Sequence, residues 1–187
     1  MPCLRVYCIM LPRKAGDSLD VSVQTLPINT EANIPLEEAV TRYSHGLLKY
    51  CYGLLCHYHD AQDAMQETFA KAYARRGSFR GDASAVTWLY KIAYNTCLSM
   101  LRRRRFFGEP RREESAEMPD PFIGSALVKA LGALKPKERA LVYARAVEDI
   151  DYEQLEIIHG TRAATLRKRY ERARKKLQKI LIAEGYE

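Results

Sequence analysis

The spacing of apolar residues is the feature of this sequence that most constrains its fold. Over residues 36–55, apolar side chains stand at positions 36, 39, 40, 43, 47, 48, 51, 54 and 55, mostly three or four apart. This is the period of an amphipathic helix with one buried face. The same period returns after Asp60, again from Trp88 to Leu101, and from Phe122 to Leu181. The pattern therefore predicts an all-α protein.

Two stretches without this period divide the chain. Residues 1–34 carry scattered apolar residues and three prolines, and we expect them to be a poorly ordered extension. Residues 107–121, FGEPRREESAEMPDP, are rich in proline and charge and predict a flexible linker. Two small helical domains remain, at residues 35–106 and 122–183. Each is small for a stable core of its own, so we expect docking onto a larger partner.

Charge and cysteine content narrow the class of protein. The formal net charge is +7 and the pI is about 9.2, which favours nucleic acid, an anionic membrane or an acidic protein surface as partner. No stretch approaches about eighteen uninterrupted apolar residues, so no membrane span is expected. The start does not have the pattern of a signal peptide. The five cysteines are odd in number and irregularly spaced. Together these features favour the reducing cytoplasm.

The stretch Cys51 to Asp60, CYGLLCHYHD, is the densest group of possible metal ligands. On a helix, Cys51 and Cys56 would lie about 140° apart around the axis, so they would not share a face. Only Cys56, His57 and His59 could converge, and three residues at a turn form a weak site. We therefore expect a hinge between two helices, with Asp60 as the helix cap and no bound metal. A metal or redox sensor is the less favoured interpretation.

Residues 151–181 predict a helix, a short turn and a second helix. Asp151 and Gln154 form a capping box, Gly160 permits the turn, and Thr161 can cap the second helix. The second helix buries Leu166, Tyr170, Ala173 and Leu177. Its other faces carry Arg162, Arg167, Lys168, Arg169, Arg172, Arg174, Lys175 and Lys176, with Glu171 as the single acid. Such a helix can enter the major groove of DNA, and a solvated basic face that binds nothing is the alternative.

Three motifs in order carry a family resemblance. They are DAQDAMQETFAKAY (60–73), FRGDASAVTWLYKIAYNTCLSMLRRRR (79–105), and ALGALKPKERALVYARAVEDIDYEQLEII (130–158) followed by TLRKRYERARKKL (165–177). Over residues 36–182, about four fifths of its length, the chain resembles an extracytoplasmic-function (ECF) sigma factor of the sigma-70 family. In that family the first domain is the region 2 helical bundle and the second is the region 4 helix-turn-helix.

The resemblance implies an initiation subunit of bacterial RNA polymerase, which is neither an enzyme nor dependent on a cofactor. Such a subunit binds the polymerase core at the clamp coiled coil and the flap, recognises promoter DNA at two elements, and helps to melt the duplex. On this chain the clamp contact would fall on the helix from Asp60 to Tyr73, through Asp63, Gln66 and Glu67. An ordinary solvated helix face is the alternative for these three residues.

Recognition of the minus-ten element would fall on the loop 78–84 and the helix after it. Phe79 and Arg80 would receive an unstacked base. Contacts to bases and backbone would come from Lys91, Asn95, Arg102 and Arg103. Phe79 could equally plug the core between helices, and Trp88 is expected in the core.

Recognition of the minus-35 element would fall on region 4. The resemblance places base reading on Arg167, Lys168 and Glu171, and phosphate contacts on Arg162, Arg172 and Arg174. Arg169 lies beside the buried stripe, where it could pair with Glu153 or Glu156.

Two further possibilities stay open. A helix-turn-helix regulator acting without polymerase would explain the second domain but not the motifs at 60–105. Many members of the family are restrained by an anti-sigma factor. Here the acidic face within 35–67, or the linker, could host one.

Overall fold

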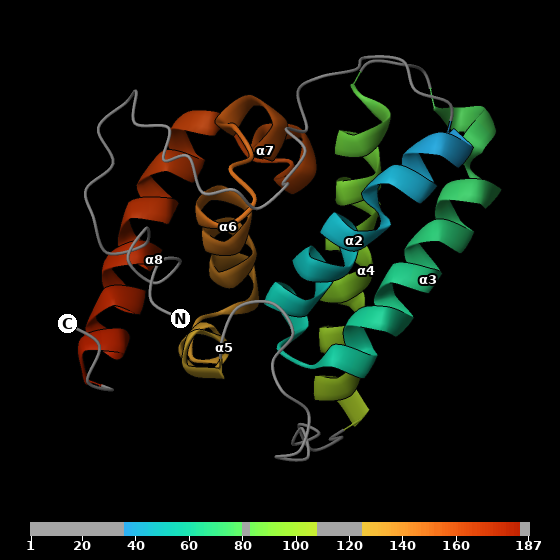
Figure 1. The fold of residues 1–187 in the computed structure, drawn as a ribbon. Coiled ribbons are helices and arrows are strands. Elements are labelled where there is room, and N and C mark those ends of the chain that lie inside the picture. Colours follow the sequence, from blue (N-terminus) through green and yellow to red (C-terminus); the bar gives the residue numbers. More distant parts are fainter. Residues whose placement is uncertain (1–35, 80–82, 108–124, 184–187) are drawn as a thin grey trace.

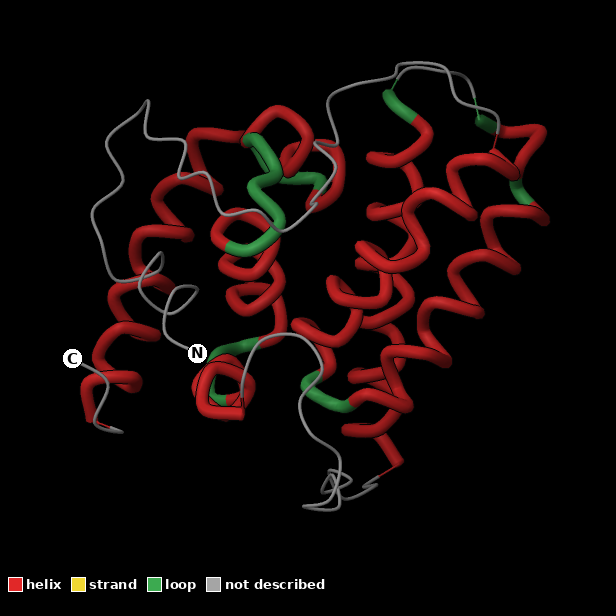
Figure 2. Tube along the Cα trace, viewed as in Figure 1, coloured by secondary structure: helices red, strands yellow, loops and turns green. Residues whose placement is uncertain are grey.

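The computed structural model describes residues 36–79, 83–107 and 125–183, which form helices without any strand (Figures 1 and 2). The elements in chain order are α2 (Leu36–Leu55), α3 (Tyr58–Ala74), the 3-10 turn η1 (Arg76–Ser78), α4 (Ala85–Phe107), α5 (Ser125–Gly132), α6 (Pro136–Ala146), α7 (Tyr152–His159) and α8 (Ala163–Ala183). The predicted extension at 1–34 lies outside the described residues, as does the predicted linker at 107–121 except for Phe107, which still belongs to α4. In the described ranges no helix is both long and apolar enough to cross a membrane.

Helices α2, α3 and α4 pack against one another as a three-helix group. The predicted stripe of α2 is buried at Leu47, Cys51 and Leu54. Tyr50 and Tyr52 are buried as well, although they do not belong to that stripe. The reason is that α2 lies between α3 and α4 on one side and α6 on another, so more than one of its faces is covered.

The turn between α2 and α3 differs from the prediction in its capping residue. Cys56 has a left-handed φ of 52°, which ends α2. His57, rather than Asp60, is the N-cap of α3, since its Nδ1 accepts a hydrogen bond from the Asp60 backbone N–H at 3.3 Å. The Asp60 side chain is buried and accepts two hydrogen bonds from Arg104 of α4. Residues 56 and 57 thus form a tight turn between α2 and α3, and Asp60, in the first turn of α3, binds Arg104 of α4.

The end of α3 also differs slightly from the prediction. Gly77 was expected to stop the helix, but α3 ends at Ala74 with Arg75 as its C-cap, and Gly77 lies in η1. Glycine commonly ends a helix, but here Gly77 is part of the 3-10 turn that follows α3.

The helix-turn-helix forms as predicted from its caps and its apolar spacing. Asp151 accepts the Gln154 N–H at 2.7 Å at the start of α7, and Gly160 ends that helix with φ 60°. Leu166, Tyr170, Ala173, Leu177 and Leu181 are the buried stripe of α8. The expected cap by Thr161 is replaced: Ala163 N–H donates to Glu156 Oε2 at 2.8 Å, and the Thr161 hydroxyl donates to His159 C=O at 3.4 Å.

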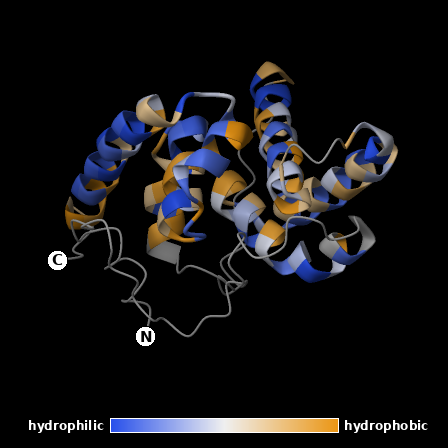
Figure 3. Cartoon of the chain, turned by 90° about the horizontal axis from the view of Figure 1, so that it is seen from above, coloured by the Kyte–Doolittle hydropathy of each residue, from blue (hydrophilic) through white to orange (hydrophobic). Residues whose placement is uncertain are grey.

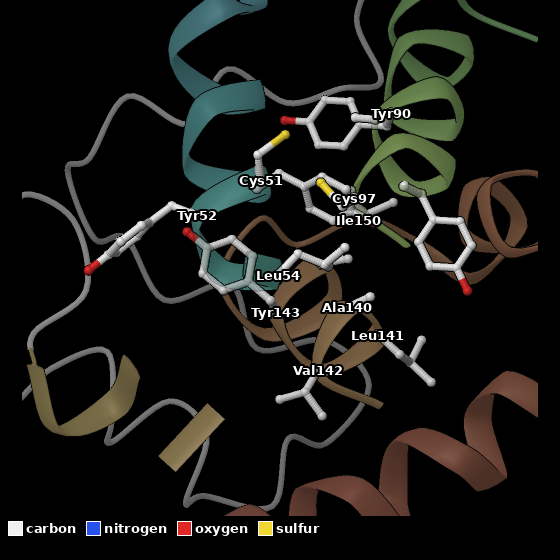
Figure 4. Close-up of a cluster of buried hydrophobic side chains, with 14 of the residues drawn as sticks. Cys51, Tyr52, Leu54, Tyr90, Cys97, Ala140, Leu141, Val142, Tyr143 and Ile150 are labelled. Carbon is white, nitrogen blue, oxygen red and sulfur yellow. The ribbon is translucent and has the colours of Figure 1, made fainter. Parts of the chain in front are cut away.

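The two predicted domains share one hydrophobic core. Helix α2 packs on α6, and α4 packs on α7. The ring of Tyr143 on α6 lies against the backbone of Gly53 on α2, and its centroid is 6.5 Å from that of Tyr50. Figure 4 shows Tyr143 among the buried side chains beside α2. The rings of Tyr94 and His159 lie 4.4 Å apart, and Arg139 Nη1 donates to Cys56 Sγ at 3.1 Å. Each half thus buries part of its apolar surface against the other, and docking onto a larger partner stays a prediction.

Candidate nucleic-acid interface

The outward side of α8 carries most of the predicted minus-35 residues. Arg167, Lys168, Glu171 and Arg172 of α8, and Arg162 directly before it, are all exposed, while the apolar stripe of α8 faces α5, α6 and α7. Figure 3 shows α8 hydrophilic on its outer side and hydrophobic toward the core. Because four of these five residues are cationic, this face suits a polyanion.

Arg167 is held in place by two neighbours on α7. Its guanidinium carbon lies 4.8 Å from the centre of the Tyr152 ring, and Nη2 lies 3.6 Å from Glu153 Oε1. A stacked and paired arginine loses less freedom when it meets a base. Glu153, one of the two acids expected to pair with Arg169, therefore pairs with Arg167. The other candidate, Glu156, caps Ala163.

Arg169 instead lies near the contact between α4 and α7. Burial, together with the positive charges of Arg169 and Lys137, lowers the pKa of His159 from 6.5 to about 4. Burial also raises the pKa of Tyr94, and Arg169 opposes that rise. The buried pair Tyr94–His159 is therefore a neutral contact flanked by cations.

Arg174 is the least exposed of the predicted phosphate ligands. Its side chain is 14% exposed, and Nη2 lies 3.5 Å from Glu171 Oε2. Because the two residues are three positions apart on α8, this ion pair orients the carboxylate of Glu171, a predicted base reader, toward Arg174.

The predicted minus-ten residues of α4 share one side of the helix. Lys91, Asn95, Arg102 and Arg103 are exposed, and the Asn95 side-chain amide donates to the Lys91 C=O at 3.0 Å. Helical geometry places residues 91, 95, 99, 102 and 106 three or four apart, so they form one continuous stripe. This arrangement lets a nucleic-acid strand run along α4.

The loop before α4 is described only at its ends. Phe79 is half-buried, and its ring lies 5.3 Å from that of Trp88. Trp88 is itself half-buried against the core, which matches its expected role. Arg80 lies outside the described residues. The pair Phe79–Trp88 presents aromatic surface at the end of α4 where the predicted base capture would occur.

The predicted polymerase contact occupies the outer face of α3. Asp63, Gln66 and Glu67 are exposed, and Glu67 pairs with Lys71 at 2.7 Å. The opposite face of α3 buries Ala61, Ala64, Thr68 and Ala72. The three polar residues are therefore available to a partner while the helix keeps its packing.

The cysteines and histidines near the first turn do not gather into a site. Across the described ranges, no group of three or more His, Cys, Asp or Glu residues could hold a metal ion. Cys51, Cys56 and Cys97 are buried free thiols. A hydrogen bond with Cys51, and to a lesser extent burial, raise the pKa of Cys97 well above its usual value. Cys51 is thus a core residue, as expected.

Sequence reasoning missed two features at the end of α4. It treated Arg102 to Arg105 as one basic run, whereas Arg104 turns inward to Asp60. It also placed Phe107 in the linker, although Phe106 and Phe107 form the last turn of α4 and are 85% and 67% exposed. Local spacing could not reveal the inward direction of Arg104, because its partner Asp60 lies 44 residues earlier in the chain.

Comparison with protein families gives two matches. The family model "Sigma-70 region 2" matches residues 39–107, and "Sigma-70, region 4" matches residues 125–177. The domain limits predicted from composition remain predictions beside these ranges.

Curated relatives agree with the family models. The chain is 30% identical over 161 residues to the RNA polymerase sigma-H factor of Pseudomonas aeruginosa, covering 76% of this chain and 83% of the relative. It is 31% identical over 171 residues to the ECF RNA polymerase sigma factor SigG of Mycobacterium tuberculosis, covering 74% of this chain but 46% of the relative. The chain thus spans less than half of SigG, and 63% of SigE of Mycolicibacterium smegmatis.

Solved structures share the fold. The sigma factor RpoE of Bartonella quintana, in complex with the anti-sigma factor NepR, matches with a TM-score of 0.68 and 25% identity, over 78% of this chain and 96% of that one. CnrH, in complex with the cytosolic domain of CnrY, matches with a TM-score of 0.64 and 21% identity, over 80% and 89%.

Proposed function

The chain belongs to the extracytoplasmic-function class of the sigma-70 family, and on that basis we propose that it directs bacterial RNA polymerase to promoters. In this role it binds the core enzyme, recognises a minus-ten and a minus-35 element, and helps to open the duplex. It catalyses no reaction of its own and requires no cofactor. Its place of action is the cytoplasm, where the polymerase meets DNA.

The observation that carries this proposal is the pairing of two matches in one chain. Region 2 precedes region 4, and most of the predicted contact residues that the structure describes lie on outward faces of α3, α4 and α8. A helix-turn-helix regulator acting alone would need only α7 and α8. It would have no use for a region 2 match that covers α2, α3 and α4.

The proposed contact with core polymerase is polar. Asp63, Gln66 and Glu67 follow one another along the outer face of α3, and Glu67 is already neutralised in part by Lys71. Exposed charged residues of this kind govern the rate and specificity of association more than its strength. The clamp coiled coil is the proposed site on the polymerase for α3, and the flap is the proposed site for region 4.

Promoter opening is proposed to occur at the start of α4. A base that leaves the stack would meet the ring of Phe79 and the cation of Lys91, which are both described. The role proposed for Arg80 rests on the family resemblance alone. Capturing such a base offsets an unstacking cost of a few kcal/mol, so no chemical step is required.

Reading of the minus-35 element is proposed for α8. Arg167, prepositioned by Tyr152 and Glu153, would address base edges together with Lys168 and Glu171. Arg162, Arg172 and Arg174 would hold the backbone.

An anti-sigma factor is a proposed regulator. Both structural relatives reported above were solved as complexes with a second protein, and in one of them that protein is an anti-sigma factor. The observations favour no single face of this chain for such a partner.

Transcription in vitro tests the proposal. The full chain, mixed with core polymerase and fragmented genomic DNA, should yield transcripts that core alone does not make. Asp63→Asn/Gln66→Ala/Glu67→Gln should weaken co-purification with core, while Glu38→Gln, an exposed acid on α2, should not. Tight duplex binding by the free chain with no transcript from any fragment would instead support a regulator that acts without polymerase.

A further inference from the structure

The C-terminal turn of α4 exposes two aromatic rings that the proposed function does not use. Phe106 and Phe107 are the two most exposed large apolar residues of the described chain, at 85% and 67%. Their rings pack on each other edge to face, with centroids 5.4 Å apart. In Figure 1 this turn projects at the lower end of α4, beyond the ends of its neighbours.

The turn is held rigid from the inside. Arg104 is bound through two hydrogen bonds to Asp60, whose side chain is 2% exposed. A bidentate pair with a buried carboxylate fixes a helix end that would otherwise fray. Arg104 therefore points inward, while its neighbours Arg103, Arg105, Phe106 and Phe107 are exposed.

Exposed cations surround the rings. Arg102 precedes Phe106 by four residues and Arg103 precedes Phe107 by four, so each arginine lies next to a ring on the helix surface. Arg105 completes the group. Toward the start of α4 the same stripe continues through Ser99, Asn95 and Lys91, about 22 Å from Phe106 along the helix axis.

These observations define one kind of ligand. Aromatic rings beside arginines bind a polyanion whose own groups can stack, and single-stranded nucleic acid combines both properties. Duplex DNA offers phosphates to the arginines but keeps its bases stacked away from the rings. The acidic side chains of a protein would pair with the arginines but cannot stack on the two rings.

We propose that Phe106 and Phe107, with Arg102, Arg103 and Arg105, form a stacking site for a base of unpaired promoter DNA, at the opposite end of α4 from the loop 78–84. That the ligand is promoter DNA rests on the proposed function. With this site, the unpaired strand would contact α4 along its whole length. Two capture points on one rigid helix would hold the strand open at both ends of the stripe.

Strand-specific binding tests the site. The full chain is titrated against a fluorescent single-stranded DNA of mixed sequence and against the same sequence as a duplex. Phe106→Ala/Phe107→Ala should weaken binding to the single strand by about tenfold or more and to the duplex by less than about twofold, because stacking contributes only to unpaired bases. Arg102→Ala/Arg103→Ala should weaken both, and should flatten the salt dependence for the single strand by up to about 0.7 per lost phosphate contact.

Matched variants control for folding and for stickiness. Tyr73 on α3 is another exposed aromatic residue, and the guanidinium of Arg76 lies over its ring. Tyr73→Ala should leave single-strand binding unchanged. Phe106→Trp should retain binding. In a Trp88→Phe background it becomes the only tryptophan, and its fluorescence should be quenched by the single strand and not by the duplex.

The outcomes separate this site from the proposed function. If the double alanine variant binds the single strand as the unaltered chain does, or loses duplex binding equally, the stacking site is wrong even where the chain directs transcription. If the unaltered chain never directs transcription but shows the ring-dependent preference for single strands, the stacking site stands and the sigma-factor role fails.

Discussion

The ring of Tyr143 occupies the space that a side chain at Gly53 would fill. A methyl group at position 53 would overlap three ring carbons of Tyr143, so α2 and α6 can approach this closely only because residue 53 has no side chain. The two residues come from different sigma regions, 90 positions apart along the chain.

Gly53→Ala should therefore loosen the contact between the two halves. We expect the free energy of unfolding to fall by about 1–3 kcal/mol, since overfilling a packed core forces side chains from their preferred positions. Urea denaturation measures this loss. Gly77→Ala is the matched control, because a methyl group there meets no atom within 4 Å and should leave stability unchanged or slightly improved.

A double substitution separates this contact from general damage to α2. Tyr143→Ala vacates the space that the new methyl group needs, so Gly53→Ala should cost much less in that background than in the unaltered chain. Strict additivity of the two losses would show that the Tyr143 ring is not what excludes a side chain at position 53.

Asp60 and Arg104 form a buried ion pair, and breaking it should be costly. Arg104→Ala leaves the Asp60 carboxylate buried without its main partner, and we expect a loss of about 3 kcal/mol in the free energy of unfolding. The neighbouring Arg103→Ala, at an exposed position, should change it by less than about 0.5 kcal/mol. Equal effects of the two substitutions in thermal denaturation would contradict the inward assignment of Arg104.

His159 should make the folded protein sensitive to acid. Its pKa is about 4 when folded and near 6.5 when unfolded, so between these values the unfolded chain binds the extra proton. Stability is then lost as pH falls below 6.5, by about 2 kcal/mol between pH 7.5 and pH 5 from this group alone. His159→Phe keeps a ring against Tyr94 and should remove that part of the pH dependence. A variant whose stability falls with acid as steeply as the parent would refute this assignment.

Arg167 and Arg172 should fail in different ways. Arg167→Ala should relax the base preference at one position of the minus-35 element, at about 1–3 kcal/mol, whereas Arg172→Ala should weaken all sequences alike and reduce the salt slope by about 0.9. Selection of promoter sequences by the reconstituted holoenzyme distinguishes the two. Loss of affinity without any change of preference for Arg167→Ala would reassign it to the backbone.

The local features of the fold were predictable from the sequence because they depend on neighbours in the chain. The buried stripe of α8 follows from spacing, and Asp151 and Gly160 act through hydrogen bonds and backbone angles within a few residues. The N-cap of α3 was not predictable in this way, since aspartate is a preferred N-cap residue and histidine is not, yet His57 is the cap. Pairing with the distant Arg104 decides the role of Asp60.

The contact between the two halves was beyond such reasoning, although one residue pointed to it. Gly53 lies inside a helix, where glycine weakens the structure by about 1 kcal/mol relative to alanine, and its presence there indicates a close approach by some other element. Sequence periodicity cannot name that element. The candidate contact residues came from family resemblance. The structure adds only that the described ones lie outward, with Arg174 and Phe79 partly covered.

Because the two halves share a core, a partner that needs them apart must compete with the contact between them. The segment 108–124 that joins them spans at most about 60 Å when fully extended, so the interface re-forms at an effective concentration near the millimolar range. Any partner that requires the halves apart binds only the open fraction, and its apparent dissociation constant rises in inverse proportion to that fraction. The contact between Tyr143 and Gly53 therefore helps to set the fraction of the protein that is open to such a partner.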